Sequence, residues 1–108
     1  MARIPTRFHG PAQVSNAAAT KHTAATGEIS LLRCIVIENP GATVNFTLSI
    51  GTDAAAVRLF DATPIAANVV DIRWVYEPIA AGEIIQAFAS VNNQLVLTLS
   101  GDRIPAMG

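Results

Sequence analysis

The sequence predicts an all-β protein: a single antiparallel β-sandwich of jelly-roll or Ig-like type with about six to eight strands and an extended N-terminal arm. Two observations predict this fold. Apolar and polar residues alternate along several short runs, and turn-forming residues separate these runs. The length of 108 residues fits one domain. We therefore expect an extended arm over residues 1–19 and a β-sandwich domain over residues 20–108.

Residues 1–19 differ from the rest of the chain because prolines, glycine and three successive alanines interrupt any period. Three alanines are too few to nucleate a helix. The two ends of the chain also share a short pattern. Proline lacks a backbone donor and keeps the preceding residue extended, so we expect extended tails at both ends. The pattern consists of Arg3-Ile4-Pro5 and Arg103-Ile104-Pro105.

From residue 20 onward the strand signal repeats. Residues 43–50 alternate most regularly, with Val44, Phe46, Leu48 and Ile50 on one face and Thr, Asn and Ser on the other. The run 28–38 is apolar at nearly every position, which predicts a central strand buried on both faces. Further alternating runs cover 70–77, 84–91 and 94–100, and weaker strands are expected near 20–25 and 56–60.

Turn-forming residues lie between these runs. Asn39-Pro40-Gly41 is the strongest turn signal, and Gly82 is available for a positive φ. Asn92-Asn93 suits a two-residue hairpin, because asparagine tolerates the left-handed region. Other breaks are expected at 51–53, 64–68 and 101–102, with a short helix possible at 53–57.

Composition excludes several classes of protein. The chain has 7 basic and 8 acidic residues, a net charge of -1 and 51% hydrophobic residues. This balance argues against intrinsic disorder and against a nucleic-acid binder, which normally carries excess Lys and Arg. Charged residues make up 14% of the chain, against about 25% in ordinary soluble domains. Low charge is typical of surfaces that other subunits cover.

The chain shows no signal peptide and no apolar run long enough to span a membrane. We therefore expect a chain that is made in the cytoplasm and has no membrane partner. The single cysteine, Cys34, lies in an apolar run and is expected to be a small buried hydrophobe.

No pattern in the sequence marks a catalytic, cofactor or metal site. The two histidines, His9 and His22, and Cys34 do not have a recognisable ligand spacing. The carboxylates fall at strand ends, turns and outward positions, where charges keep sheets soluble. We therefore expect no cofactor and no enzymatic activity, with a small enzyme as the least favoured alternative.

Trp74 and Tyr76 share one face of their strand and leave two roles open. Core residues are the favoured interpretation, because Val70 and Ile72 lie on the same face. If the two aromatic side chains are exposed, they suit stacking on a sugar or anchoring an interface.

Several segments resemble small structural proteins of tailed-phage virions, over roughly residues 20–104. They are a Gly-led strand at 26–39, a strand at 42–50 with a T-V-x-F-x-L-x-I register, residues 64–67 and 79–87, and a closing strand at 95–101. The resemblance implies a compact β-sandwich present in many copies. The chain departs from that pattern in its bulky Trp74-Val75-Tyr76 segment and its N-terminal arm.

From this resemblance we expect a non-enzymatic virion protein, assembled in the host cytoplasm, that decorates and stabilises the capsid. A tail or neck accessory protein and a receptor- or carbohydrate-binding module of the virion are the alternatives. The expected partners are major capsid or tail proteins and copies of the chain itself. The candidate interface residues are Arg3, Ile4, Pro5, Arg7, Phe8, Trp74, Tyr76, Arg103 and Ile104.

Overall fold

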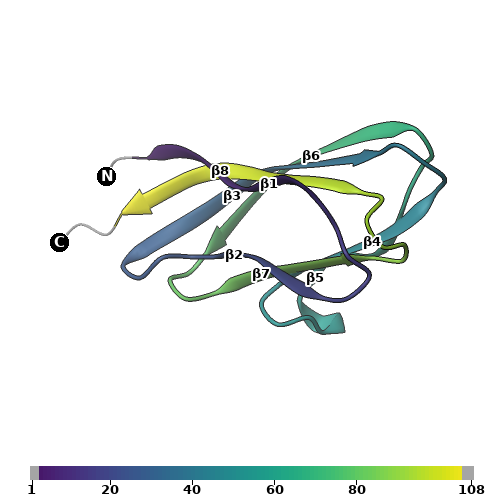
Figure 1. Ribbon diagram of the computed structural model, residues 1–108. Helices are drawn as coiled ribbons and strands as arrows, with labels where there is room; N and C mark the ends of the chain where they lie inside the picture. Colours follow the sequence, from purple (N-terminus) through teal and green to yellow (C-terminus); the bar gives the residue numbers. More distant parts are fainter. Residues whose placement is uncertain (1–2, 106–108) are drawn as a thin grey trace.

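The computed structural model describes residues 3–105, and within this range it contains eight β-strands and a short 3₁₀ helix at Ala55–Val57. The strands form two antiparallel sheets, with the orders β1-β8-β3-β6 and β2-β7-β4-β5. Figure 1 shows the two sheets stacked face to face. The predicted all-β sandwich is therefore confirmed. The strands are β1 (Ile4–Gln13), β2 (Ala19–Thr23), β3 (Glu28–Asn39), β4 (Val44–Ile50), β5 (Arg58–Ile65), β6 (Val69–Ile79), β7 (Ile84–Ala89) and β8 (Val96–Pro105).

The core lies between the two sheets and follows the alternation of the strands. Val44, Phe46 and Leu48 of β4 are buried in it, as their period of two predicts. Phe46 and Phe60 meet edge to face, with ring centroids 5.3 Å apart. From the first sheet, the central strands β3 and β8 contribute the inward side chains Leu32, Ile35, Ile37, Leu97 and Leu99.

The turns mostly fall where the sequence predicts them. The Asn39-Pro40-Gly41 segment separates β3 from β4, Gly82 has a φ of +83°, and the short helix lies within the expected segment. The expected break at 101–102 is wrong, because β8 continues through Gly101 and Asp102 to Pro105. The expected hairpin at Asn92-Asn93 is also wrong. Asn93 does adopt the left-handed region, with φ 57°, but β7 and β8 belong to different sheets. The segment therefore connects a strand of one sheet to a strand of the other. Strands that are adjacent in the sequence need not be neighbours in a sheet.

Asn39 holds one end of the sandwich together although it is polar and 1% exposed. Its Nδ2 donates to the carbonyl oxygens of Ala42 and Ile65 at 2.9 and 3.0 Å. Its Oδ1 accepts from the Gly41 N–H at 3.1 Å and from Gln94 Nε2 at 2.7 Å. These bonds satisfy the buried amide and tie the end of β3 to both neighbouring turns.

An arm separate from the sandwich is not seen in the described residues. Ile4–Gln13 forms β1, an edge strand that pairs antiparallel with β8. The two Arg-Ile-Pro segments are not free tails, because Ile4 pairs with Arg103 and Pro5 with Asp102. Proline is tolerated on an edge strand, where its missing donor faces away from the neighbouring strand. Residues 1–2 of the expected arm and 106–108 of the expected sandwich domain lie outside the described residues.

Candidate functional site

The outer face of the first sheet carries the features that set this protein apart from a plain sandwich. Strand pairing defines rows of side chains across this face, since residues opposite each other in a sheet point to the same side. Cys34 of β3 lies between Trp74 of β6 and Ser100 of β8, and Ser100 pairs with Arg7 of β1. The next row joins Thr98, Val36 and Ile72. The face is therefore polar over β1 and β8 and apolar over β3 and β6.

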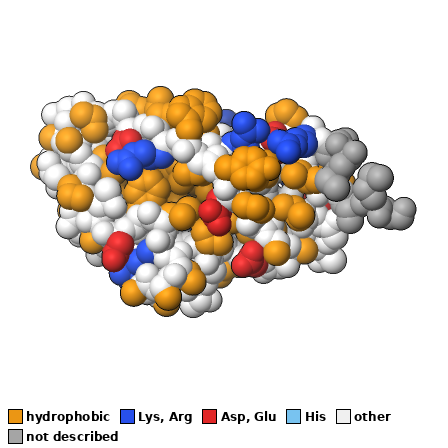
Figure 2. All heavy atoms as spheres, turned by 180° about the vertical axis from the view of Figure 1, so that it is seen from behind, with side chains coloured by type: hydrophobic (Ala, Val, Ile, Leu, Met, Phe, Trp, Pro, Cys, Tyr) orange, Lys and Arg blue, Asp and Glu red, His pale blue; other side chains and the backbone are white. Residues whose placement is uncertain are grey.

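The apolar half is an exposed stripe along β6, which we call the β6 stripe. The expectation that Trp74 and Tyr76 belong to the core is wrong, because both side chains are exposed. Val70 and Ile72, which lie on the same face of the strand, are also exposed. The strand orients its opposite face inward, where Val75 packs against the core. Seen from behind the view of Figure 1, hydrophobic side chains gather along the rim and across the middle of the molecule (Figure 2). The β6 stripe consists of Val70 (58% exposed), Ile72 (52%), Trp74 (79%) and Tyr76 (64%).

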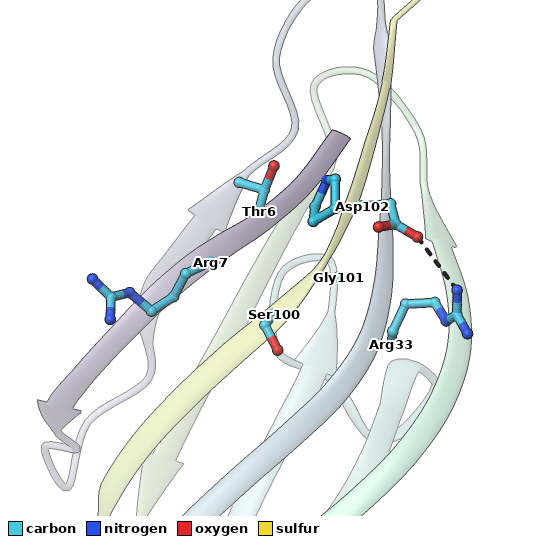
Figure 3. A pocket seen from close by; sticks show the side chains of 7 residues that line it. Thr6, Arg7, Arg33, Ser100, Gly101 and Asp102 are labelled. Atoms are coloured by element: carbon cyan, nitrogen blue, oxygen red, sulfur yellow. Dashed lines mark hydrogen bonds and ion pairs between the residues drawn. The ribbon is translucent and has the colours of Figure 1, made fainter. Parts of the chain in front are cut away.

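The polar half contains an open hollow of about 480 Å³ beside β1, β8 and β3. Arg33 Nη1 donates to Asp102 Oδ2 at 3.3 Å, and Figure 3 shows this pair pointing together while Arg7 points away. Gly101 allows the close approach of β8 to β3, because a Cβ there would collide with the Leu31 carbonyl oxygen. The hollow is lined by Pro5, Thr6, Arg7, Arg33, Ser100, Gly101 and Asp102.

The remaining candidate interface residues lie at the β1–β8 end of the sheet. Arg3, Ile4, Pro5 and Arg7 are exposed, whereas Phe8 is half-buried against the core. Arg103 is half-buried with its Nε 3.8 Å from Glu28 Oε2. Ile104 pairs with Ile29 and lines a second, apolar hollow next to Gly27. The strand pairing thus brings the residues of β1 and β8 together, but it leaves Trp74 and Tyr76 on the far edge.

Charged side chains line the rim of the sandwich where the edge strands β6 and β5 lie. Arg73 Nε and Nη2 donate to the Asp71 carboxylate at 2.8 and 3.0 Å, which lowers the pKa of Asp71. The Arg73 guanidinium also lies 5.3 Å from the Phe60 ring centroid. On β5, Arg58 bonds Asp53 through Nε and Nη2, both at 3.0 Å, and lowers the pKa of that carboxyl. These pairs neutralise the rim without burying unpaired charge.

The opposite rim, between β1 and β2, carries the two histidines. His22 Nε2 lies 2.9 Å from Ser30 Oγ, and its ring packs against Phe8 in a tilted arrangement with centroids 4.5 Å apart. Burial lowers the pKa of both His9 and His22, and for His9 the charge of Lys21 adds to the effect. His9 Nε2 is buried without a hydrogen-bond partner among the described residues. Both rings therefore favour the neutral form.

Sequence reasoning singled out Trp74 and Tyr76 but missed Arg33, Ser100 and Asp102. These three residues come from two strands that are distant in the chain, so no local spacing marks them. One signal for the β6 stripe was present in the sequence. The side chains of Trp74-Val75-Tyr76 are bulkier than those expected at this place in the phage-protein pattern that the sequence resembles. Large aromatic side chains on an edge strand are typical of a contact surface.

Residues 3–105 contain no group of three or more His, Cys, Asp and Glu side chains placed to hold a metal ion. The same residues contain no helix that is long and apolar enough to cross a membrane. No family model matches the sequence, and no curated protein or solved structure matches it either.

Proposed function

We propose that this chain is a non-enzymatic structural protein of a tailed-phage virion that decorates and stabilises the capsid through the outer face of its first sheet. The β6 stripe carries this proposal. Four large hydrophobic side chains on one strand face, each more than half exposed, are costly to leave in water. A partner that covers them gains that free energy on binding.

The strand order supports the same proposal. We assign it to the jelly-roll class, because β1-β8-β3-β6 over β2-β7-β4-β5 is the order of two interleaved Greek keys. Viral capsid domains use this architecture, as do lectins and cupins, so the fold favours a virion role without requiring it. A place on the tail or neck would use the same face.

Particles of the phage that encodes this chain provide the test. Quantitative mass spectrometry of purified virions should find the chain in a fixed ratio to the major capsid protein. Particles grown without it should lose DNA at a lower temperature. Adding back the chain should restore stability, whereas a Trp74→Ser, Tyr76→Ser double variant should not.

A matched control for the double variant is Leu59→Ser, which removes an exposed apolar side chain from β5 of the other sheet. It should bind the particles as the unaltered chain does. If purified virions lack the chain, or if the double variant binds as well as the control, the proposal is wrong.

A carbohydrate-binding module is the second candidate, and one observation favours it. Trp74 offers a highly exposed ring in the same row as Ser100 and Arg7, next to the Arg33–Asp102 pair. An aromatic platform beside hydrogen-bonding groups suits a sugar ring. A glycan array should then give a signal that Trp74→Ala abolishes and Leu59→Ser leaves intact. An array without signal excludes this candidate for the glycans it carries.

A further inference from the structure

The two edge strands of the first sheet differ in how well their outer edges are protected. β1 contains Pro5 and Pro11 and has two register shifts against β8, which disrupt a continuous row of backbone donors and acceptors. β6 ends the strand order on the other side, and no strand within residues 3–105 pairs with its second edge. Its proline, Pro78, lies next to its end. β6 therefore presents an edge that another strand can extend.

The regular part of β6 is short and has a defined centre. The strand begins at Val69, after the turn at Asn68, and its pairing with β3 is regular as far as Trp74. Between Trp74 and Glu77 the register shifts, and β6 has one more residue than β3. Such a bulge bends the edge and ends regular pairing. The segment available to a new strand therefore runs from Val69 to Trp74, with Ile72 near its middle.

Among the registers that place charged residues opposite one another, the charges on this segment favour one for pairing with a second copy. Asp71 and Arg73 flank Ile72 on the face opposite the β6 stripe. An antiparallel pair centred on Ile72 places each Asp71 opposite the Arg73 of the other copy. Centring on Asp71 or Arg73 would place like charges opposite each other, and centring on Trp74 would oppose Asp71 to Glu77. Opposite charges in cross-strand pairs stabilise a sheet, and like charges destabilise it.

The apolar face fits the same register. A two-fold axis at Ile72 places the two Ile72 side chains together and each Val70 opposite the Trp74 of the other copy. The two β6 stripes would then join into one wider apolar band on the outer face, in which side chains that are 52–79% exposed in the single chain flank one another across the new strand pair. Such an interface is isologous, as in most homodimers.

We infer that β6 pairs antiparallel with β6 of a second copy about a two-fold axis at Ile72, so that the first sheets of two copies form one continuous sheet. Backbone hydrogen bonds would supply affinity, and the Asp71–Arg73 pairs would fix the register. The inference deepens the proposed function by naming a partner for the β6 stripe, and it rests on that function only in treating the stripe as a contact surface. Self-pairing is measured on the isolated chain and virion binding on particles, so each can fail without the other.

Charge exchange provides the main test, by sedimentation velocity of the purified chain over a range of concentrations. The unaltered chain should form a dimer whose fraction rises with concentration. Asp71→Arg and Arg73→Asp, each alone, should weaken the dimer about tenfold or more, because both place like charges opposite each other. Mixing these two variants should restore a dimer, because each copy then supplies the complement of the other.

The matched control is Arg33→Asp, which reverses a charge and breaks an ion pair between β3 and β8, one strand in from the free edge of β6. It should dimerise as the unaltered chain does, and circular dichroism should show that every variant is folded. A chain that remains monomeric at all concentrations overturns the inference. So does a mixture of the two single variants that stays monomeric.

A cross-link tests the register itself in a Cys34→Ala background. Under mild oxidation, Ile72→Cys should form a covalent dimer, since the axis places residue 72 opposite itself. Val70→Cys should not cross-link, because it faces Trp74. A cross-link at Val70 in place of Ile72 would contradict this register.

Discussion

Strands β4 and β6 have the same alternating pattern but opposite orientations. Val44, Phe46 and Leu48 of β4 point into the core, whereas Ile72 and Trp74 of β6 point into solvent. The difference follows from their positions, since β4 lies between two strands and β6 lies at an edge. At the edge, the inward face of β6 reaches the rim of the sandwich, where Asp71 and Arg73 remain partly in water. Apolar alternation therefore identifies a strand without stating which face is buried.

The largest expected difference between the two strands is in stability. Phe46→Ala should lower the free energy of unfolding by about 3–5 kcal/mol, because it leaves a cavity in the core. Trp74→Ala should change it by less than about 0.5 kcal/mol, since an exposed side chain makes little packing. Urea titrations followed by far-UV circular dichroism measure both. A similar loss for the two variants would mean that the β6 stripe packs on the fold after all.

A buried polar residue sharpens the contrast with the exposed apolar ones. Asn39→Ala should cost about 2–3 kcal/mol, because it leaves buried carbonyl and amide groups without their partners. Asn45→Ala, at an exposed position on β4, is the matched control and should cost far less. Thermal unfolding of the three chains provides the comparison. Equal melting temperatures for Asn39→Ala and the control would show that the turn does not depend on the Asn39 bonds.

The two rims of the sandwich should respond to acid in different pH ranges. The pKa of His9 and His22 is lowered in the fold, so below about pH 6.5 the unfolded chain takes up protons that the folded chain resists. Stability should therefore fall as the pH drops from 7.5 to 5. On the opposite rim, the pKa of Asp71 and Asp53 is lowered by their arginine partners. These ion pairs should therefore keep their contribution to stability until the pH approaches about 4.

Melting temperatures over this pH range measure the effect. A His9→Gln, His22→Gln double variant should flatten the decline between pH 7.5 and 5 and leave the decline near pH 4 unchanged. An undiminished decline above pH 5 in the double variant would mean that other groups cause it.

A small effect on stability is also expected in the polar half of the outer face. Arg33→Gln removes an ion pair whose arginine side chain is 48% exposed, and it should change stability by less than about 1 kcal/mol. Its effect on binding to glycans or particles should be larger if the hollow takes part in recognition. Parallel unfolding and binding measurements separate the two. A large loss of stability would make Arg33 a structural residue.

Residue-level predictions were most accurate where they depended on local signals. The turn at Asn39-Pro40-Gly41, the positive φ at Gly82 and the buried strand around Ile35 follow from neighbouring residues. The Asn92-Asn93 segment shows the limit of such signals. Its left-handed residue was predicted, but whether the flanking strands pair depends on the order of strands in each sheet.

The sequence by itself determined an all-β chain with most of its turns and its low charge, because alternation, turn propensity and composition are local properties. Only the tertiary structure decided that β1 joins a sheet, that Arg33 and Asp102 meet across strands, and that the β6 stripe faces outward. These features depend on strand order and on position at a sheet edge, which arise from contacts between residues far apart in the chain.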